Sequence, residues 1–122
     1  MCGIAAFLPK GKYAPDRRLL LSMGMANEER GTDNCGIAVG KEIKVGGGVQ
    51  SKFREFYIAN KKEIDELLNT PSKPVIIHTR RSATWNVGSD YAHPFWFGFK
   101  EPTPEIENYI VGCHNGIVTN KE

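Results

Sequence analysis

The N-terminal part of the chain contains a short apolar run followed by apolar residues at helical spacing. Residues 3–8 form the run, which ends before Pro9, and this length and boundary predict a buried strand. Pro15 and Asp16 then form a helix start, and apolar residues recur every three or four positions until Gly31. We therefore expect a strand followed by a helix of about four turns.

The middle of the chain contains a β region and a second amphipathic stretch. Residues 36–40 and 42–45 are short pieces rich in Ile and Val, and the triple glycine at 46–48 predicts a turn after them. Over residues 53–68, apolar side chains fall on one helix face and charged side chains on the other. This pattern predicts a single helix that ends before Pro71.

Three further apolar stretches lie in the C-terminal part. Residues 75–79 form a compact predicted strand, and residues 95–99 and 109–113 are further strand candidates separated by loop and proline-interrupted sequence. Strands and helices of this kind in one chain predict the α+β class.

Length and composition are those of one soluble globular domain over residues 1–122. The chain is 40% hydrophobic and 25% charged, which argues against disorder, collagen-like repeats and a coiled coil. A chain of this size buries about two thirds of its unfolded surface, enough for a core without disulfides.

The balance of charge does not favour a polyanionic partner. The formal net charge is +2, and the basic residues are scattered or paired rather than gathered in a run. We therefore expect neither nucleic acid nor a membrane surface as partner.

The three cysteines indicate a reducing compartment. Cys2, Cys35 and Cys113 are an odd number with no C-x-x-C spacing, which argues against a disulfide framework and a zinc site. Cys35 and Cys113 lie in apolar sequence and are expected to be buried. With no secretory signal and no long apolar segment, the sequence predicts a cytoplasmic protein.

Cys2 is a candidate nucleophile because removal of Met1 would leave its thiol beside a free α-amine. A thiol of pKa about 8.5 is only a few per cent thiolate at about pH 7, and an α-amine of pKa about 7.7 to 8.0 is nearly matched to take its proton. One residue would then supply both nucleophile and base. A cysteine in this position can equally be a small terminal residue without a chemical role.

Two other positions have both a functional and an ordinary interpretation. Asn115 and Gly116 follow an apolar strand, where an amide side chain and a backbone N–H could stabilise an oxyanion, but the same dipeptide is typical of a turn. Arg80 ends a predicted strand and could bind a carboxylate with its planar guanidinium or simply be solvated.

Five segments occur in a distinctive order along the chain. They are Cys2-Gly3-Ile4, RGTDNCGIA at residues 30–38, His78-Thr79-Arg80 with Ala83-Thr84, Ala92-His93-Pro94-Phe95, and His114-Asn115-Gly116-Ile117 with Asn120. In order and spacing this set resembles the class II glutamine amidotransferases, which belong to the N-terminal nucleophile hydrolases. The resemblance depends on the whole set and extends from residue 2 to residue 120.

The resemblance implies a glutaminase reaction without a cofactor. L-glutamine would be hydrolysed to glutamate and ammonia through a thioester on Cys2, whose α-amine would be the base. Asn115 and Gly116 would form the oxyanion hole, Arg80 would hold the substrate α-carboxylate, and Thr84 would line the same pocket. The ammonia would pass to an acceptor on a partner protein or a further domain.

The family fold is an αββα sandwich with two antiparallel sheets between helical layers. Because the chain ends shortly after Gly116, we expect this sandwich to be incomplete at its C-terminus. Exposed strand edges would then be covered by a protein partner or by self-association. No nucleotide-binding motif identifies an ammonia acceptor.

Four other residues are expected near the site. No two histidines of the chain have metal-ligand spacing, so His78 and His93 are predicted to hydrogen-bond loops near the site rather than bind zinc. Arg30 and Asp33 are predicted to form a structural ion pair or a turn that shapes the pocket wall.

Some features depart from the family and leave other functions open. The segment from Arg80 to Thr84 is one residue longer than in many members, and Trp85 stands where a histidine is frequent. The aspartate that binds the substrate α-amino group has no counterpart here, and a retained Met1 would block the α-amine. The alternatives are a non-catalytic remnant acting as a binding or assembly module, and a related hydrolase acting on another amide.

Overall fold

The main sheet of the protein is antiparallel throughout. The computed structural model describes residues 1–82, 88–98 and 109–116. In spatial order, the strands of the main sheet are β1 (Gly3–Phe7), β4 (Val75–Arg80), β2 (Asn34–Val39) and β3 (Glu42–Gly47). A second antiparallel sheet pairs β5 (Phe95–Phe97) with β6 (Ile110–Gly112). Antiparallel sheets together with helices confirm the α+β class.

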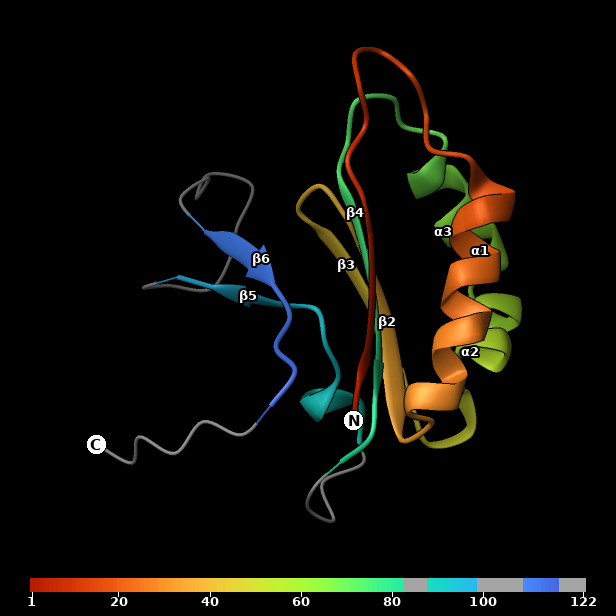
Figure 1. Ribbon diagram of the computed structural model, residues 1–122, viewed down its shortest axis with the longest axis vertical. Helices are drawn as coiled ribbons and strands as arrows, with labels where there is room; N and C mark the ends of the chain where they lie inside the picture. The colour runs from red at the N-terminus through yellow and green to blue at the C-terminus, as the bar shows by residue number, and fades with distance from the viewer. Residues whose placement is uncertain (83–87, 99–108, 117–122) are drawn as a thin grey trace.

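Helices cover one face of the main sheet, and β5 and β6 lie on the side of the opposite face (Figure 1). The helices are α1 (Arg17–Ala26), α2 (Phe53–Ala59) and α3 (Lys61–Leu68), with short 3₁₀ turns at Asn27–Arg30, Gly48–Gln50 and Ser89–Tyr91. Side chains alternate along each strand, so every second residue faces the helices. The core between sheet and helices contains Leu20, Cys35, Ile37, Phe53, Phe56, Ile64, Val75 and Ile77, all of them almost completely buried.

Helix α1 begins where the sequence predicts. The Asp16 side chain accepts a hydrogen bond from the backbone N–H of Leu19 at 3.1 Å, which satisfies one of the donors left free at a helix start. The regular helix ends at Ala26, and the remaining residues up to Arg30 form a 3₁₀ turn. On its inner face, a Cβ on Gly24 would lie 2.3 Å from the Phe53 ring, so glycine permits the close approach of α1 and α2.

The predicted single helix over residues 53–68 is wrong, because the chain breaks at Asn60. The backbone there has φ −116° and ψ 21°, which ends α2 and starts α3. The Asn60 side chain donates to the carbonyl of Phe56 at 2.8 Å and to Gln50 Oε1 at 2.9 Å. A side chain that bonds to nearby acceptors in this way competes with a continuous helix.

The predicted strands are all present, but their ends differ. The pieces predicted at 36–40 and 42–45 form β2 and β3, which extend to Asn34 and Gly47 because these residues pair across the ladder. The triple glycine is therefore largely strand rather than turn, and only Gly48 takes a positive φ of 61°. In the second sheet the strands are shorter than predicted, and residue 99 lies outside the described residues.

The face of the main sheet opposite the helices is contacted by the segment that leads into β5. Asn34 Nδ2 donates to the carbonyl of Gly88 at 3.3 Å. A Cβ on Gly36 would lie 2.3 Å from the carbonyl oxygen of His93, so only glycine allows this approach. Among the residues that the structure describes, no helix has the length and apolar character needed to cross a membrane.

Candidate active site

Strand alternation places the candidate residues on the face of the main sheet that points away from the helices. Gly3 pairs with Thr79, and the Thr79 hydroxyl donates to the carbonyl of Asn27 on the helical side at 2.6 Å. Residues one step away on the same strands point to the other face. By this alternation Cys2, just before β1, and Arg80, at the end of β4, fall on the face that carries the second sheet.

Cys2 is held by Asn115 through two hydrogen bonds. The backbone N–H of Cys2 donates to Asn115 Oδ1 at 3.3 Å, and Asn115 Nδ2 donates to the carbonyl of Cys2 at 3.4 Å. The Cys2 thiol lies 3.8 Å from the carbonyl oxygen of Arg81. Two residues that are 113 positions apart, both predicted from the sequence as site residues, are thus in direct contact.

An open hollow lies beside this contact. It has a volume of about 360 Å³ and is lined by Cys2, Gly3, Ile4, Asn27, Arg30 and Asn115. Gly116, next to Asn115, has a φ of 144°, which a residue with a side chain rarely adopts. Glycine therefore lets the chain turn at the point where Asn115 meets Cys2.

Arg80 borders a second hollow, of about 330 Å³, which is also lined by Asp90, Tyr91, Ala92, His93 and Phe95. The Arg80 side chain is partly buried, and its backbone carbonyl accepts a hydrogen bond from the N–H of Asp33 at 2.9 Å. Asp33 and the first residue of β2 therefore hold the end of β4 in place. Thr84, which was predicted to line the pocket, lies outside the described residues.

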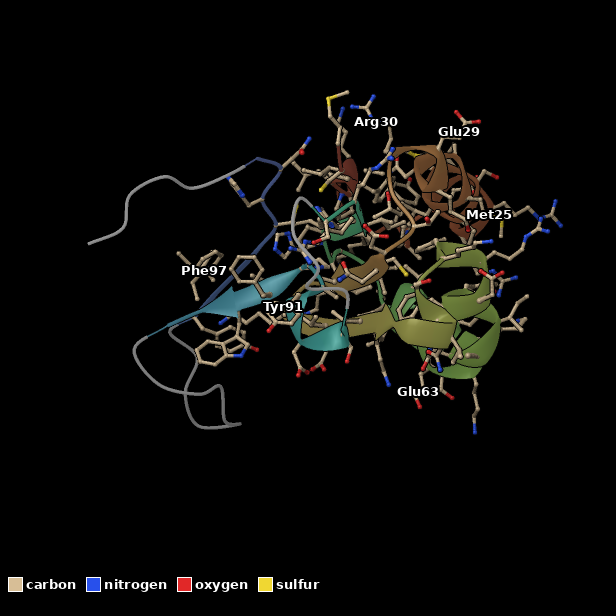
Figure 2. The ribbon with its side chains drawn as sticks, turned by 90° about the horizontal axis from the view of Figure 1, so that it is seen from below. Met25, Glu29, Arg30, Glu63, Tyr91 and Phe97 are labelled. Carbon is tan, nitrogen blue, oxygen red and sulfur yellow. The ribbon has the colours of Figure 1, made fainter. Side chains whose placement is uncertain are left out.

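Asp33 and Arg30 occupy different surroundings. Asp33 Oδ2 accepts a hydrogen bond from the backbone N–H of Ser82 at 2.6 Å, which fixes the segment that follows Arg80. Arg30 lies at the outer rim of the molecule, and its Nη2 atom is 3.8 Å from Met1 Sδ (Figure 2). Within the described residues, the predicted alternative of an Arg30–Asp33 ion pair is absent, and Asp33 shapes the turn instead.

His78 and His93 form a stack between the two sheets. Their ring centroids are 4.6 Å apart, and His93 stacks in turn on Phe95 at 4.6 Å. His93 Nδ1 accepts a hydrogen bond from the backbone N–H of His114 at 3.3 Å, next to Asn115. His93 thus contacts the loop that carries Asn115.

The surroundings of these rings favour their neutral forms. His78 is completely buried, and neither of its ring nitrogens has a hydrogen-bond partner among the described residues. Burial, together with the nearby His93, lowers the pKa of His78 to about 4. Burial and then the charge of Arg80 lower the pKa of His93. In the described part of the chain, no three His, Cys, Asp or Glu side chains gather as metal ligands would.

Two polar residues near the site, Asn34 and Asn27, were not predicted from the sequence. Asn34 is fully buried, and its Oδ1 atom lacks a hydrogen-bond partner among the described residues. The sequence feature that could have indicated Asn34 is a polar residue at the start of an apolar strand, two positions before a glycine. Asn27, which lines the hollow beside Cys2, gave no comparable signal because it lies at the end of a helical pattern.

The two remaining cysteines differ from each other. Cys35 is buried as predicted, and burial, with the charges of Glu28 and Glu55, raises its pKa to about 12. Cys113 was also predicted to be buried, but it is only partly so, because it follows β6 at the edge of the second sheet.

Comparison of the chain with protein family models, with curated protein sequences and with solved structures finds no match in any of the three.

Proposed function

We propose that this chain is a glutaminase of the class II glutamine amidotransferase type, which hydrolyses L-glutamine to glutamate and ammonia. The observation that carries the proposal is the paired hydrogen bonding of Cys2 and Asn115 from opposite ends of the described chain. The five sequence segments that resemble this family assign the nucleophile to the first of these residues and an oxyanion donor to the second. Their direct contact supports the proposal, because it brings an amide donor next to the proposed nucleophile.

In the proposed reaction, removal of Met1 turns the backbone nitrogen of Cys2 into a free α-amine. This amine takes the proton of the Cys2 thiol, and the sulfur attacks the side-chain carbonyl carbon of glutamine. Because Asn115 Oδ1 already accepts a hydrogen bond from this nitrogen, it would orient the amine. The amide nitrogen leaves as ammonia with a proton from the amine, and water then hydrolyses the thioester to release glutamate.

Asn115 has the donors that the oxyanion requires. A side-chain amide carries two N–H bonds, and one of them is directed at the carbonyl of Cys2. The second remains for the oxygen that becomes negative in the tetrahedral intermediate, together with the backbone N–H of Gly116. Donors that are held in place before the reaction stabilise the charge without further reorganisation.

Arg80 is proposed to bind the α-carboxylate of the substrate. Strand alternation puts it on the same face of the sheet as Cys2, and a guanidinium can form two parallel hydrogen bonds to a carboxylate. Thr84 is proposed to complete this pocket. An aliphatic chain the length of glutamine would then extend from Arg80 towards the Cys2 sulfur.

We further propose that the fold is the αββα sandwich and that a protein partner or a second copy completes it. The helices, the main sheet and the second sheet follow one another in the order of its first three layers (Figure 1). In the second sheet, Phe97 is 50% exposed and Ile110 is 72% exposed, which indicates an apolar surface for further chain to cover. The partner would also carry the ammonia acceptor.

The test is labelling with a diazoketone analogue of glutamine, followed by intact mass spectrometry. We expect loss of the Met1 mass, a single adduct, and release of glutamate and ammonia from glutamine by the unlabelled protein. Cys2→Ala should abolish both the adduct and the release, whereas Cys113→Ser should keep the adduct. A chain that keeps Met1 and takes no label would overturn the proposal in favour of a binding or assembly module.

A further inference from the structure

Cys113 lies on the same segment that brings Asn115 to Cys2. It follows β6 directly, and Asn115 comes two residues later. Because Asn115 contacts Cys2 through both of its polar side-chain atoms, the short segment that carries Cys113 passes close to Cys2.

Both thiols are accessible and neither is fixed in a strand. Cys2 and Cys113 are each partly exposed, in contrast to the fully buried Cys35. Cys2 lies just before β1, and Cys113 lies just after β6. A disulfide needs Cα atoms about 4.4 to 6.8 Å apart, and a short segment outside the sheet ladder can shift to meet this requirement.

We propose that Cys113 is the resolving cysteine of a reversible disulfide with Cys2, formed when the protein meets a peroxide. The bond itself does not depend on the proposed glutaminase activity, but its consequence does, since it would occupy the proposed nucleophile. Cys113 thereby makes the site sensitive to oxidation.

The chemistry proceeds in two balanced steps. The Cys2 thiolate attacks one oxygen of the peroxide, the O–O bond breaks, and the leaving hydroxide or alkoxide takes up a proton, which gives a sulfenic acid on Cys2. The Cys113 thiolate then attacks the Cys2 sulfur, the S–O bond breaks, and the hydroxide leaves as water. Two thiols are oxidised, the peroxide is reduced, and an added dithiol reverses the reaction.

The electrostatics of the pair agree with this order of events. Burial, and then the charge that Cys2 carries when ionised, raise the pKa of Cys113, so the two thiols lie within electrostatic reach of each other. A sulfenic acid on Cys2 is neutral and no longer contributes that charge. Oxidation of Cys2 therefore makes Cys113 easier to deprotonate when it has to attack.

The test is peptide mapping of the full chain after treatment with hydrogen peroxide and alkylation of the remaining thiols. Trypsin releases the three cysteines on separate peptides, residues 1–10, 31–41 and 101–121. We expect the first and third peptides to be joined with the loss of two hydrogen atoms, and to separate again with dithiothreitol. Glutaminase activity, where present, should fall and recover in step with this link.

Two variants make the result decisive. In Cys113→Ser, a cyclic dione should trap the sulfenic acid on Cys2, whereas in the unchanged chain the disulfide should compete with the trap. Cys35→Ser should leave the link intact. The proposal would be overturned by a link from Cys2 to Cys35 or by a link only between two chains. It would also be overturned if the oxidation products of Cys2 were the same in Cys113→Ser as in the unchanged chain. A link without any glutaminase activity would overturn only the proposed function.

Discussion

Along β4, neighbouring residues face two very different environments. Val75 and Ile77 point to the helices and are completely buried among aliphatic and aromatic side chains. His78 and Arg80 point to the second sheet, where the neighbours are Asn34, His93 and backbone groups. One face of the strand contributes apolar burial, and the other carries polar groups, among which the His78 ring nitrogens lack a hydrogen-bond partner among the described residues.

Under the proposed function, one sheet would serve stability on one face and chemistry on the other. Apolar packing stabilises the fold without requiring particular partners. Buried polar atoms such as the His78 ring nitrogens cost free energy unless water, substrate or protein groups satisfy them. Residues on the two faces should therefore respond in opposite ways to substitution, with stability affected on one face and turnover on the other.

The largest effect on stability is expected for Phe56→Ala on the helical face. Removing a fully buried ring leaves a cavity and should lower the free energy of unfolding by about 3–5 kcal/mol. Ile4→Ala is the matched change on the other face, where Ile4 is 45% exposed, and should cost about 1 kcal/mol or less. Urea unfolding measures both, and equal losses would contradict the contrast between the faces.

The largest effect on turnover is expected for Asn115→Ala. Loss of the proposed oxyanion donor should lower kcat about a hundredfold or more, while the exposed position should leave the melting temperature nearly unchanged. Asn69→Ala, at the exposed C-terminal end of α3, is the control and should change neither quantity. Steady-state kinetics with glutamine, combined with a thermal melt, separates the two readouts.

The pH dependence of stability should reveal the lowered pKa of His78. Its pKa is about 4 in the folded protein and about 6.5 in an unfolded chain. Between these values the unfolded chain binds a proton that the folded one does not, so stability falls as the pH is lowered from about 6.5 towards 4.

This loss should reach the order of 3 kcal/mol at the acidic end. Urea unfolding of the protein at several pH values measures the slope, and His78→Gln should flatten it. If His78→Gln has the same slope as the unchanged chain, the pH dependence of stability does not come from His78.

A smaller effect, on substrate binding, is expected for Arg80→Lys. A single ammonium cannot form the two parallel hydrogen bonds of a guanidinium, so KM for glutamine should rise about tenfold while kcat changes little. The glutamine dependence of ammonia release measures both constants. Unchanged saturation would exclude Arg80 as the carboxylate-binding residue.

The smallest effect is expected for Asp16→Ala at the start of α1. Loss of the N-terminal cap should lower stability by about 1 kcal/mol and leave turnover unchanged, because α1 lies on the face away from the site. Asp16→Asn should retain most of the stability, since an amide oxygen also caps a helix. Reduced turnover in Asp16→Ala would show that the two faces are coupled.

Sequence patterns predicted which helices and strands form more accurately than they predicted where each one ends. Strand β4 and the start of α1 follow from local patterns, because an apolar run and a capping residue act over a few positions. The break at Asn60 could not be predicted, since it depends on a hydrogen bond to Gln50 from another part of the chain. The pairing of Gly46 and Gly47 with β2 likewise comes from tertiary contacts.

The candidate site was predictable in part for a related reason. Cys2, Arg80 and Asn115 were singled out by their types and by the family resemblance, and the structure brings Cys2 into contact with Asn115. The burial of Asn34 and the packing of His78 against His93 were not foreseen, because both depend on the segment before β5 crossing the main sheet at Gly36. Contacts between layers leave no local signature in a single sequence.

Strand β1 pairs with β4 alone among the described strands, so it forms the outer edge of the main sheet. An edge strand can detach by breaking one ladder, at a free-energy cost well below that of opening the whole domain. Its amide hydrogens should therefore exchange with solvent earlier than those of β2, which has a neighbour on each side. Because Cys2 immediately precedes this strand, warming would disorder the thiol's position while the helices and the inner strands were still folded.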